Sequence, residues 1–139
     1  VLDLVTIHSD GDDMAILERG ETVDTMRRLQ REGKVRAVGF SAKTAAGIGA
    51  AASQCDVLMV TMNPAEQAMA SALSACAEQG PGILLKKPLG SGHLAQQAGQ
   101  LAASLALAMT CCDNGAALVG TLSPDHLLEN VKIAKGLTG

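Results

Sequence analysis

The sequence has almost no aromatic residues: its 139 residues include no tyrosine, no tryptophan and one phenylalanine. A tyrosine hydroxyl is therefore excluded as the proton donor in any reaction that this chain carries out by itself. Basic residues are also few, because 11 Lys and Arg stand against 14 Asp and Glu and leave a net charge of -3. This balance lacks the basic patch that attracts nucleic acids and anionic lipid, so we expect neither as a partner.

Long hydrophobic runs are missing as well. The longest apolar stretch, residues 101–109, is interrupted by Ser104 and is far shorter than the roughly 20 residues that cross a bilayer. The opening residues, Val-Leu-Asp-Leu-Val-Thr-Ile, contain no methionine and no basic region before an apolar core. We expect no membrane span and no secretory signal, and we expect the chain to begin inside a longer reading frame.

The cysteines show no spacing that indicates a paired site. They are Cys55, Cys76, Cys111 and Cys112. None belongs to a Cys-x-x-Cys motif, and adjacent cysteines such as Cys111 and Cys112 rarely reach disulfide geometry. Reduced thiols are therefore expected, which is typical of a cytoplasmic protein.

A short acidic cluster, Asp10, Asp12 and Asp13, is the candidate for a metal site. One short loop supplies no paired set of oxygen ligands, however. We interpret the cluster as solvated loop charge and expect no bound metal.

The sequence does contain a repeated strand-sized pattern. A hydrophobic fraction of 47% with 18% charged residues is ordinary for a globular protein, and residues 1–139 suit one domain. Runs rich in Val, Ile and Leu occur at residues 2–7, 35–40, 56–62, 83–87 and 117–121. Because each run is nearly continuous rather than alternating, the pattern favours parallel strands that are buried on both faces.

Helical signals lie between these runs. Val23, Met26 and Leu29 form an apolar stripe in a helix that should end at Gly33. Helices commonly stop at such a glycine because it adopts the left-handed conformation without strain.

Two further helices are indicated by a capping residue followed by proline. Asn63-Pro64, with Glu66 as the capping-box carboxylate, predicts a helix that continues to about residue 78. Ser123-Pro124 repeats the signature and predicts a helix that ends near residue 135.

Strand followed by helix, repeated along the chain, is the order of a (β/α) barrel or of an open doubly wound sheet. No Gly-x-Gly-x-x-Gly motif follows any expected strand, and Gly47-Ile48-Gly49 lies inside a helical stretch. Since the dinucleotide fingerprint of the open-sheet class is missing, the barrel is favoured.

Five segments at the expected strand ends are more distinctive. They are Leu-Asp-Leu-Val-Thr-Ile-His-Ser at 2–9, Gly-Lys-Val-Arg-Ala-Val-Gly-Phe-Ser at 33–41, Val-Thr-Met-Asn-Pro at 60–64, Gly-Ile-Leu-Leu-Lys-Lys-Pro-Leu-Gly-Ser-Gly at 82–92 and Val-Gly-Thr-Leu-Ser-Pro-Asp-His-Leu-Leu-Glu-Asn at 119–130. In this order they resemble the fourth to eighth strands of the aldo-keto reductase family, closest to bacterial members. The resemblance implies an α/β fold: a partial TIM-type barrel of about five parallel βα units, the C-terminal part of a barrel that has eight.

The resemblance also implies a chemistry. The family transfers hydride between a nicotinamide cofactor and a carbonyl group, with a tetrad of Asp, Tyr, Lys and His. Only the histidine can be placed, at His8, where it would orient the substrate oxygen; the other three belong to earlier strands of the family. The intact parent is expected to be an NAD(P)-dependent carbonyl or aldehyde oxidoreductase, and the chain alone is expected to be inactive.

At the nicotinamide end of the cofactor, the resemblance matches Ser41 to the residue that bonds the carboxamide, although the next residue is Ala42 instead of the usual Asn. Lys86 stands where many members stack an aromatic ring on the nicotinamide. A glycine-containing loop matches the segment along the pyrophosphate, where glycines permit close backbone approach. The residues expected there are Leu89, Ser91 and Gly92.

At the adenosine end, the start of the last expected helix offers hydroxyls and free backbone N–H groups to a phosphate. The residues expected there are Thr121, Ser123, His126, Glu129 and Asn130. NADP-preferring members often carry Lys at the position of Gly120 and Arg at that of His126, so the bidentate grip on a 2′-phosphate is lost. NADP and NAD both remain candidates for the parent, and the alternative for the chain alone is that it binds neither.

A second interpretation is a non-enzymatic folding or binding module that associates with itself. An incomplete barrel leaves two strand edges and an apolar sheet face uncovered, and such surfaces associate. On either interpretation we expect a homo-oligomer, most simply a dimer, and a small carbonyl substrate only in the parent.

Overall fold

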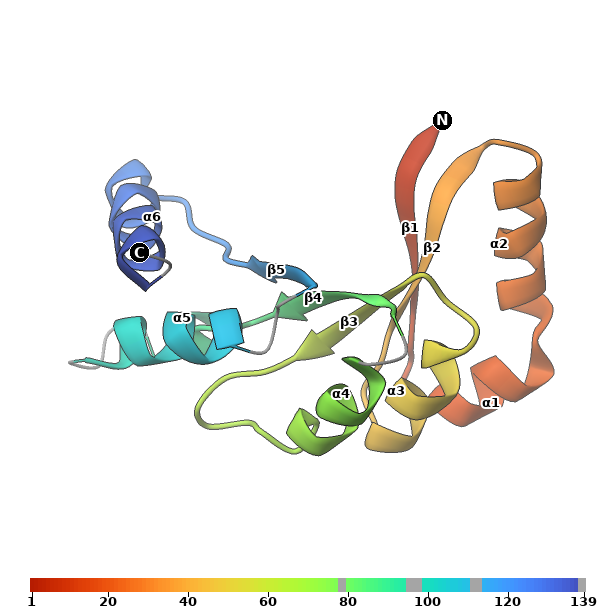
Figure 1. Cartoon of the computed structure of the whole chain (residues 1–139), viewed down its shortest axis with the longest axis horizontal. Helices are drawn as coiled ribbons and strands as arrows, with labels where there is room; N and C mark the ends of the chain where they lie inside the picture. The colour runs from red at the N-terminus through yellow and green to blue at the C-terminus, as the bar shows by residue number, and fades with distance from the viewer. Residues whose placement is uncertain (78–79, 95–98, 111–113, 138–139) are drawn as a thin grey trace.

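The structure is a computed structural model that describes residues 1–77, 80–94, 99–110 and 114–137. Within these residues the chain forms one sheet of five parallel strands in sequence order, so each strand pairs with the next along the chain (Figure 1). The strands are β1 (Leu2–His8), β2 (Val35–Ser41), β3 (Val57–Thr61), β4 (Gly82–Lys86) and β5 (Gly115–Leu118). This order is that of consecutive barrel units and confirms the partial TIM-type barrel.

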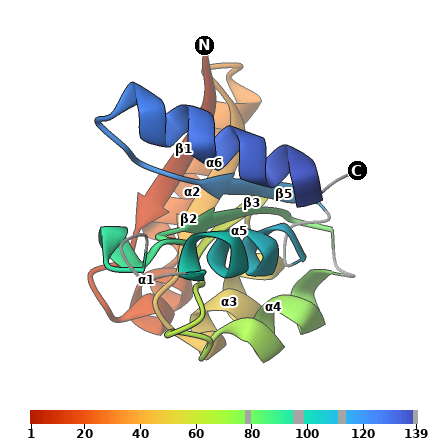
Figure 2. The same ribbon diagram turned by 90° about the vertical axis from the view of Figure 1, so that its left-hand side faces the viewer.

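Helices follow the strands and lie along one side of the twisted sheet (Figures 1 and 2). They are α1 (Asp13–Arg19), α2 (Glu21–Arg31), α3 (Ala45–Ala52), α4 (Ala70–Ala77), α5 (Gln100–Thr110) and α6 (Pro124–Leu137), with a short 3-10 turn, η1 (Gly90–Gly92). The last helix, α6, packs beside α5. The other side of the sheet carries no helix formed by the described residues.

The core lies between the sheet and these helices. Val38, Phe40, Leu58 and Leu85 of the strands are fully buried there with Ile48 of α3. Burial alternates along β3 and β4, and the intervening residues are only half-buried. The prediction that the sheet is buried on both faces is therefore wrong: helices cover one face, while half-buried apolar side chains such as Val57 and Leu84 lie on the other.

The first four predicted strands agree with the structure to within one or two residues, but the fifth is displaced. It was expected at residues 117–121 and occupies Gly115–Leu118. The bounds of β5 are set by its partner β4, because Ile83 pairs with Gly115 and β4 ends at Lys86, opposite Leu118. Beyond Leu118 no residue of β4 remains to continue the ladder.

The helix predicted after the third strand begins later than expected. The side chain of Asn63 accepts a hydrogen bond from the backbone N–H of Ala65 at 3.0 Å and donates one to the carbonyl of Lys87 at 3.3 Å. Asn63 and Glu66 close a turn through their backbones, so α4 starts only at Ala70. The expected end at residue 78 lies outside the described residues.

The other two predicted helices are confirmed. Helix α2 ends at Arg31, and Gly33 has the left-handed φ of 72° that terminates it. At the start of α6, the hydroxyl of Ser123 accepts a hydrogen bond from the backbone N–H of His126 at 3.3 Å, and the helix continues to Leu137. Local capping chemistry is therefore sufficient at both sites.

The acidic cluster is not simply solvated loop charge. Asp12 caps α1 through the N–H of Ala15, but Asp13 is buried, with 1% of its surface exposed. One of its oxygens accepts hydrogen bonds from the backbone N–H groups of Lys43 and Thr44 at 2.9 and 2.7 Å, and from the Thr44 hydroxyl at 2.8 Å. Burial raises the pKa of Asp13, but the hydrogen bonds that its carboxylate accepts outweigh burial and lower it. Asp13 therefore ties the loop after β1 to the loop after β2.

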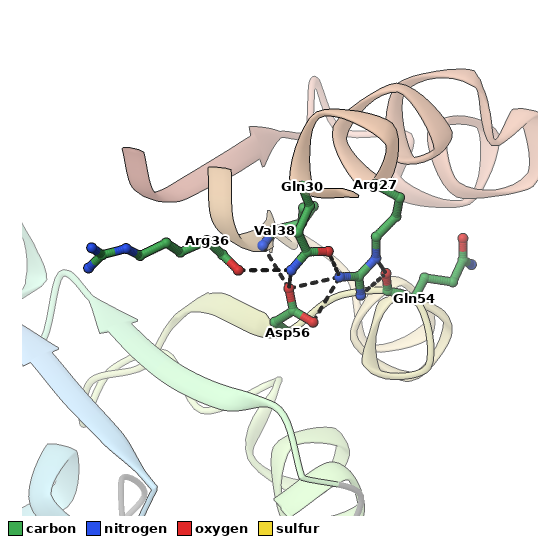
Figure 3. A network of polar contacts seen from close by, with 6 residues as sticks. All are labelled: Arg27, Gln30, Arg36, Val38, Gln54 and Asp56. Carbon is green, nitrogen blue, oxygen red and sulfur yellow. Dashed lines mark hydrogen bonds and ion pairs between the residues drawn. The ribbon is translucent and has the colours of Figure 1, made fainter. Parts of the chain in front are cut away.

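A second polar network lies at the opposite, N-terminal end of the sheet (Figure 3). Arg27 of α2 donates to both carboxylate oxygens of Asp56 at 2.8 Å and to the carbonyl of Gln54. Asp56 also accepts from the Gln30 amide at 2.9 Å and from the backbone N–H of Val38 at 2.8 Å. The network joins α2, β2 and the residue that precedes β3.

The remaining expectations concern thiols, metals and membranes. Cys55 and Cys76 are buried free thiols, and burial, the largest influence, raises the pKa of Cys55 to about 11. Cys111 and Cys112 lie outside the described residues. In the part of the chain that the structure describes, no three His, Cys, Asp or Glu side chains are grouped to hold a metal ion. No described helix has the length and hydrophobicity to cross a membrane.

Candidate functional site

His8, Ser41 and Lys86 lie at the C-terminal ends of β1, β2 and β4, the end of a barrel from which active sites are built. His8 pairs in register with Ser41, and the Lys86 ammonium donates a hydrogen bond to the Ser41 hydroxyl at 2.7 Å. His8 is exposed, whereas Ser41 is buried. The structure thus brings together the three residues that sequence reasoning assigned to the substrate and nicotinamide end.

The surroundings of Lys86 disfavour its charged form. Partial burial lowers its pKa, and the positive charges of Lys87 and Lys43 lower it further. Asp13 and Glu66 act in the opposite direction without cancelling this effect. Lys86 is therefore less readily protonated than an ordinary surface lysine.

A cavity of about 290 Å³ gathers most residues predicted for the other end of the cofactor. The loop after β4 provides one wall and the first half of α6 provides the other. Its lining comprises Leu89, Gly92, Leu101, Gly120, Thr121, His126, Glu129 and Asn130. Six of these were expected from sequence, and Leu101 of α5 was missed because its apolar helix gave only a packing signal.

Ser91 and Ser123 lie beside this cavity rather than in its lining. Ser91, with Leu89, Gly92 and Gly120, lines a neighbouring cavity of about 320 Å³. The Thr121 hydroxyl accepts a hydrogen bond from the N–H of Ser123 at 3.1 Å. The hydroxyls of Thr121 and Ser123 therefore already accept hydrogen bonds from backbone N–H groups at the start of α6.

The loop after β4 is held in a conformation that side chains rarely adopt. Lys87 and Ser91 have φ values of 53° and 58°. The carbonyl of Lys87 is fixed by hydrogen bonds from the Asn63 side chain and the N–H of Gly90, which keep the turn in place. Strained backbone of this kind often accompanies binding sites.

Sequence reasoning missed a third cavity, of about 280 Å³, which we call the lysine cavity. Its lining includes Lys43, Lys86 and Lys87, together with Thr61 and Glu66. Lys43 and Lys87 follow the ends of β2 and β4. Their position shortly after strands that end at a barrel mouth is the signal that could have identified them.

A family model described as the aldo/keto reductase family matches residues 1–105. No curated protein matches the chain. A Pseudomonas aeruginosa structure classed as an aldo-keto reductase is 38% identical, with 99% of this chain and 52% of that chain covered and a TM-score of 0.87.

More distant structures share the fold. The holo form of an aldo-keto reductase from Bacillus halodurans is 19% identical, covers 96% of this chain and 55% of its own length, and has a TM-score of 0.74. An aldo-keto reductase of the silkworm, Bombyx mori, is 13% identical over 97% of this chain and 52% of its own, with a TM-score of 0.64. The chain spans about half the length of the solved structures that it matches. The family model matches most of the chain, and the Pseudomonas aeruginosa structure is 38% identical to it over 99% of the chain's length. The chain therefore belongs to the aldo/keto reductase family.

Proposed function

We propose that this chain is the C-terminal part of an NAD(P)-dependent carbonyl or aldehyde oxidoreductase, and that by itself it binds nucleotide without reducing carbonyls. The observation that carries the proposal is the 290 Å³ cavity, in which Leu89, Gly92, Thr121, His126, Glu129 and Asn130 come together from two distant segments. Family membership and the parallel half-barrel support it. We also propose a cytoplasmic location, on the basis of the cysteine pattern.

The adenosine end of a dinucleotide fits the residues that are present. The cavity combines an imidazole, a carboxylate, an amide and a hydroxyl from His126, Glu129, Asn130 and Thr121. Its volume is near the lower end of ligand pockets, about 300 Å³, which suits part of a dinucleotide. Since Gly120 and His126 supply no guanidinium fork for a 2′-phosphate, both NADP and NAD are candidates.

The nicotinamide end fits less well. The Ser41 hydroxyl, which would hydrogen-bond the carboxamide, already accepts a hydrogen bond from the Lys86 ammonium. The charge of Lys86 would also repel the positively charged ring of an oxidised nicotinamide. A bound nicotinamide would supply the hydride in this family's chemistry. Of the residues present, the exposed His8 is positioned to orient a carbonyl oxygen, but a sequence without tyrosine lacks the family's proton donor.

An assay of NADPH oxidation tests the catalytic part of the proposal. The purified chain is mixed with NADPH and a series of aldehydes, beside the variant His8→Ala. No oxidation above buffer is expected from either protein. Oxidation that increases with the amount of chain and falls in His8→Ala would contradict the proposal.

Self-association is a second candidate function, and the uncovered sheet favours it. The outer edges of β1 and β5 pair with no other described strand. The face without helices presents Leu4, Val57, Met59 and Leu84, which are half-buried. A second copy that covers this face and these edges would form a homodimer with no requirement for catalysis.

A further inference from the structure

The lysine cavity concentrates positive charge at the mouth of the half-barrel. Lys43 comes from the loop after β2, and Lys86 and Lys87 come from the end of β4 and the residue that follows it. These segments are more than 40 residues apart in sequence, so the fold and not a local charge run brings the lysines together. The same cavity is lined by one carboxylate, that of Glu66.

The three ammonium groups lack matching counter-charges. Within the described residues, the salt bridges involve Arg27, Arg28, Lys34 and Arg36, and none of the cavity lysines. Lys86 is half-buried, and its ammonium donates a hydrogen bond to the neutral hydroxyl of Ser41. In the nearby carboxylate of Asp13, one oxygen already accepts hydrogen bonds from the backbone N–H groups of Lys43 and Thr44.

A half-buried cation is costly when burial removes water and the nearby opposite charges do not compensate for that loss. Repulsion by Lys43 and Lys87 adds to this cost and lowers the pKa of Lys86. An oxyanion in the cavity would relieve both effects, since it would accept charge-assisted hydrogen bonds from the lysines. The Thr61 side chain lines the same space and offers a hydroxyl donor.

We propose that the lysine cavity binds the carboxylate or phosphate group of a small anionic molecule. The site is distinct from the 290 Å³ cavity, because no residue lines both. The proposal goes beyond the proposed function and requires neither carbonyl reduction nor dinucleotide binding. In an intact parent it would select substrates that carry a negative charge.

Titration of the whole chain with inorganic phosphate and, separately, with malonate tests the proposal. Backbone amide resonances are followed by NMR at constant ionic strength, with chloride as the competing anion. We expect saturable shifts at Ala42, Lys43, Thr61 and Lys87. Tighter binding of phosphate would assign a phosphate ligand and tighter binding of malonate a carboxylate, and either result supports the site.

The matched variants are Lys86→Met and Lys34→Met. Both remove one positive charge, but Lys34 pairs with Glu32 at the far end of β2. Lys86→Met should weaken anion binding by about tenfold, and Lys34→Met by less than about twofold, since only Lys86→Met removes an ammonium that contacts the anion. Lys43→Met provides a second variant with an exposed lysine, should Lys86→Met fail to fold, and it too should weaken binding.

Three results would overturn the proposal. The first is the absence of saturable shifts with either anion at millimolar concentration. The second is equal weakening in Lys86→Met and Lys34→Met, which would indicate general charge attraction. The third is a shift map centred on Thr121, His126 and Asn130, which would place the anion in the 290 Å³ cavity instead.

Discussion

The carboxylate of Asp13 occupies the space that a side chain at Gly47 would need. A Cβ built at position 47 overlaps both the carboxylate and the Cβ of Asp13. Asp13 lies at the start of α1, about 30 residues before Lys43 and Thr44 in sequence, yet it accepts hydrogen bonds from the backbone N–H groups of both residues, which precede α3. The glycine therefore permits the contact that joins the loop after His8 to the loop after Ser41.

Replacing Gly47 with alanine should destabilise the chain by about 1–3 kcal/mol, because an added methyl group must displace the buried carboxylate. Gly49→Ala in the same helix is the matched control. Its Cβ would meet nothing within 4 Å, so the better helix propensity of alanine should stabilise by up to about 1 kcal/mol. Urea unfolding at one fixed protein concentration measures both. Equal effects of the two variants would contradict the packing described at Asp13.

The Arg27–Asp56 network should contribute measurably to stability. Asp56→Asn removes the charge that accepts bonds from Arg27, Gln30 and Val38, and should cost about 2 kcal/mol. Asp3→Asn breaks another Arg–Asp pair, but its side chains are 72% and 84% exposed, and the cost should stay below about 0.5 kcal/mol. Thermal and urea unfolding compare the two variants. A larger loss in Asp3→Asn would refute the assignment.

The same network predicts how stability depends on pH. Burial raises the pKa of Asp56, but hydrogen bonds from Arg27, Val38 and Gln30 lower it below its ordinary value of 3.8. A carboxyl with a lowered folded-state pKa stabilises the protein above that ordinary value, and its contribution is lost as pH falls through the folded-state pKa. The stability difference between wild type and Asp56→Asn should therefore be full at pH 7 and shrink below about pH 4. A difference that stays constant down to pH 2 would show that the charge is not its source.

Self-association should depend on the uncovered sheet face. Light scattering coupled to size exclusion is expected to give at least twice the chain mass of 14.1 kDa at micromolar concentration. Leu84→Lys places a charge on that face and should shift the mass towards the monomer, whereas Ala46→Lys, on the exposed side of α3, should not. A wild-type mass of one chain, with a cooperative melt, would mean that the chain closes its own edges.

The parts of the fold that sequence predicts well are those with local causes. Helix α2 follows from its apolar stripe and from Gly33, and α6 follows from the cap at Ser123. The first four strands contain enough Val, Ile and Leu to mark them. The fifth begins Gly-Ala-Ala, which carries little apolar signal, and it is a strand because β4 offers it a partner from Ile83 onwards.

The failures arise where distant residues decide the outcome. Asp13 resembles its exposed neighbours in sequence, and its burial depends on Lys43 and Thr44, about 30 residues away. Likewise, Asn63-Pro64 predicts the start of a helix, but the Asn63 amide donates a hydrogen bond to the carbonyl of Lys87 and a turn forms instead. Resemblance to a family supplied the candidate site residues, and only the folded chain shows which of them share a cavity.

Calorimetric titration of the chain with NADP, NAD and ADP tests the central claim most directly, with Gly120→Lys as the informative variant. Gly120 lines the 290 Å³ cavity and a Cβ at this position meets nothing within 4 Å, so a side chain can be added there without a clash at its first carbon. We expect saturable binding of all three nucleotides by the unaltered chain, and a gain of about tenfold for NADP over NAD in Gly120→Lys, because the new ammonium would pair with the 2′-phosphate. No binding at millimolar concentration by either protein, or an equal gain for NADP and NAD, would contradict the assignment of this cavity to the adenosine end of the cofactor.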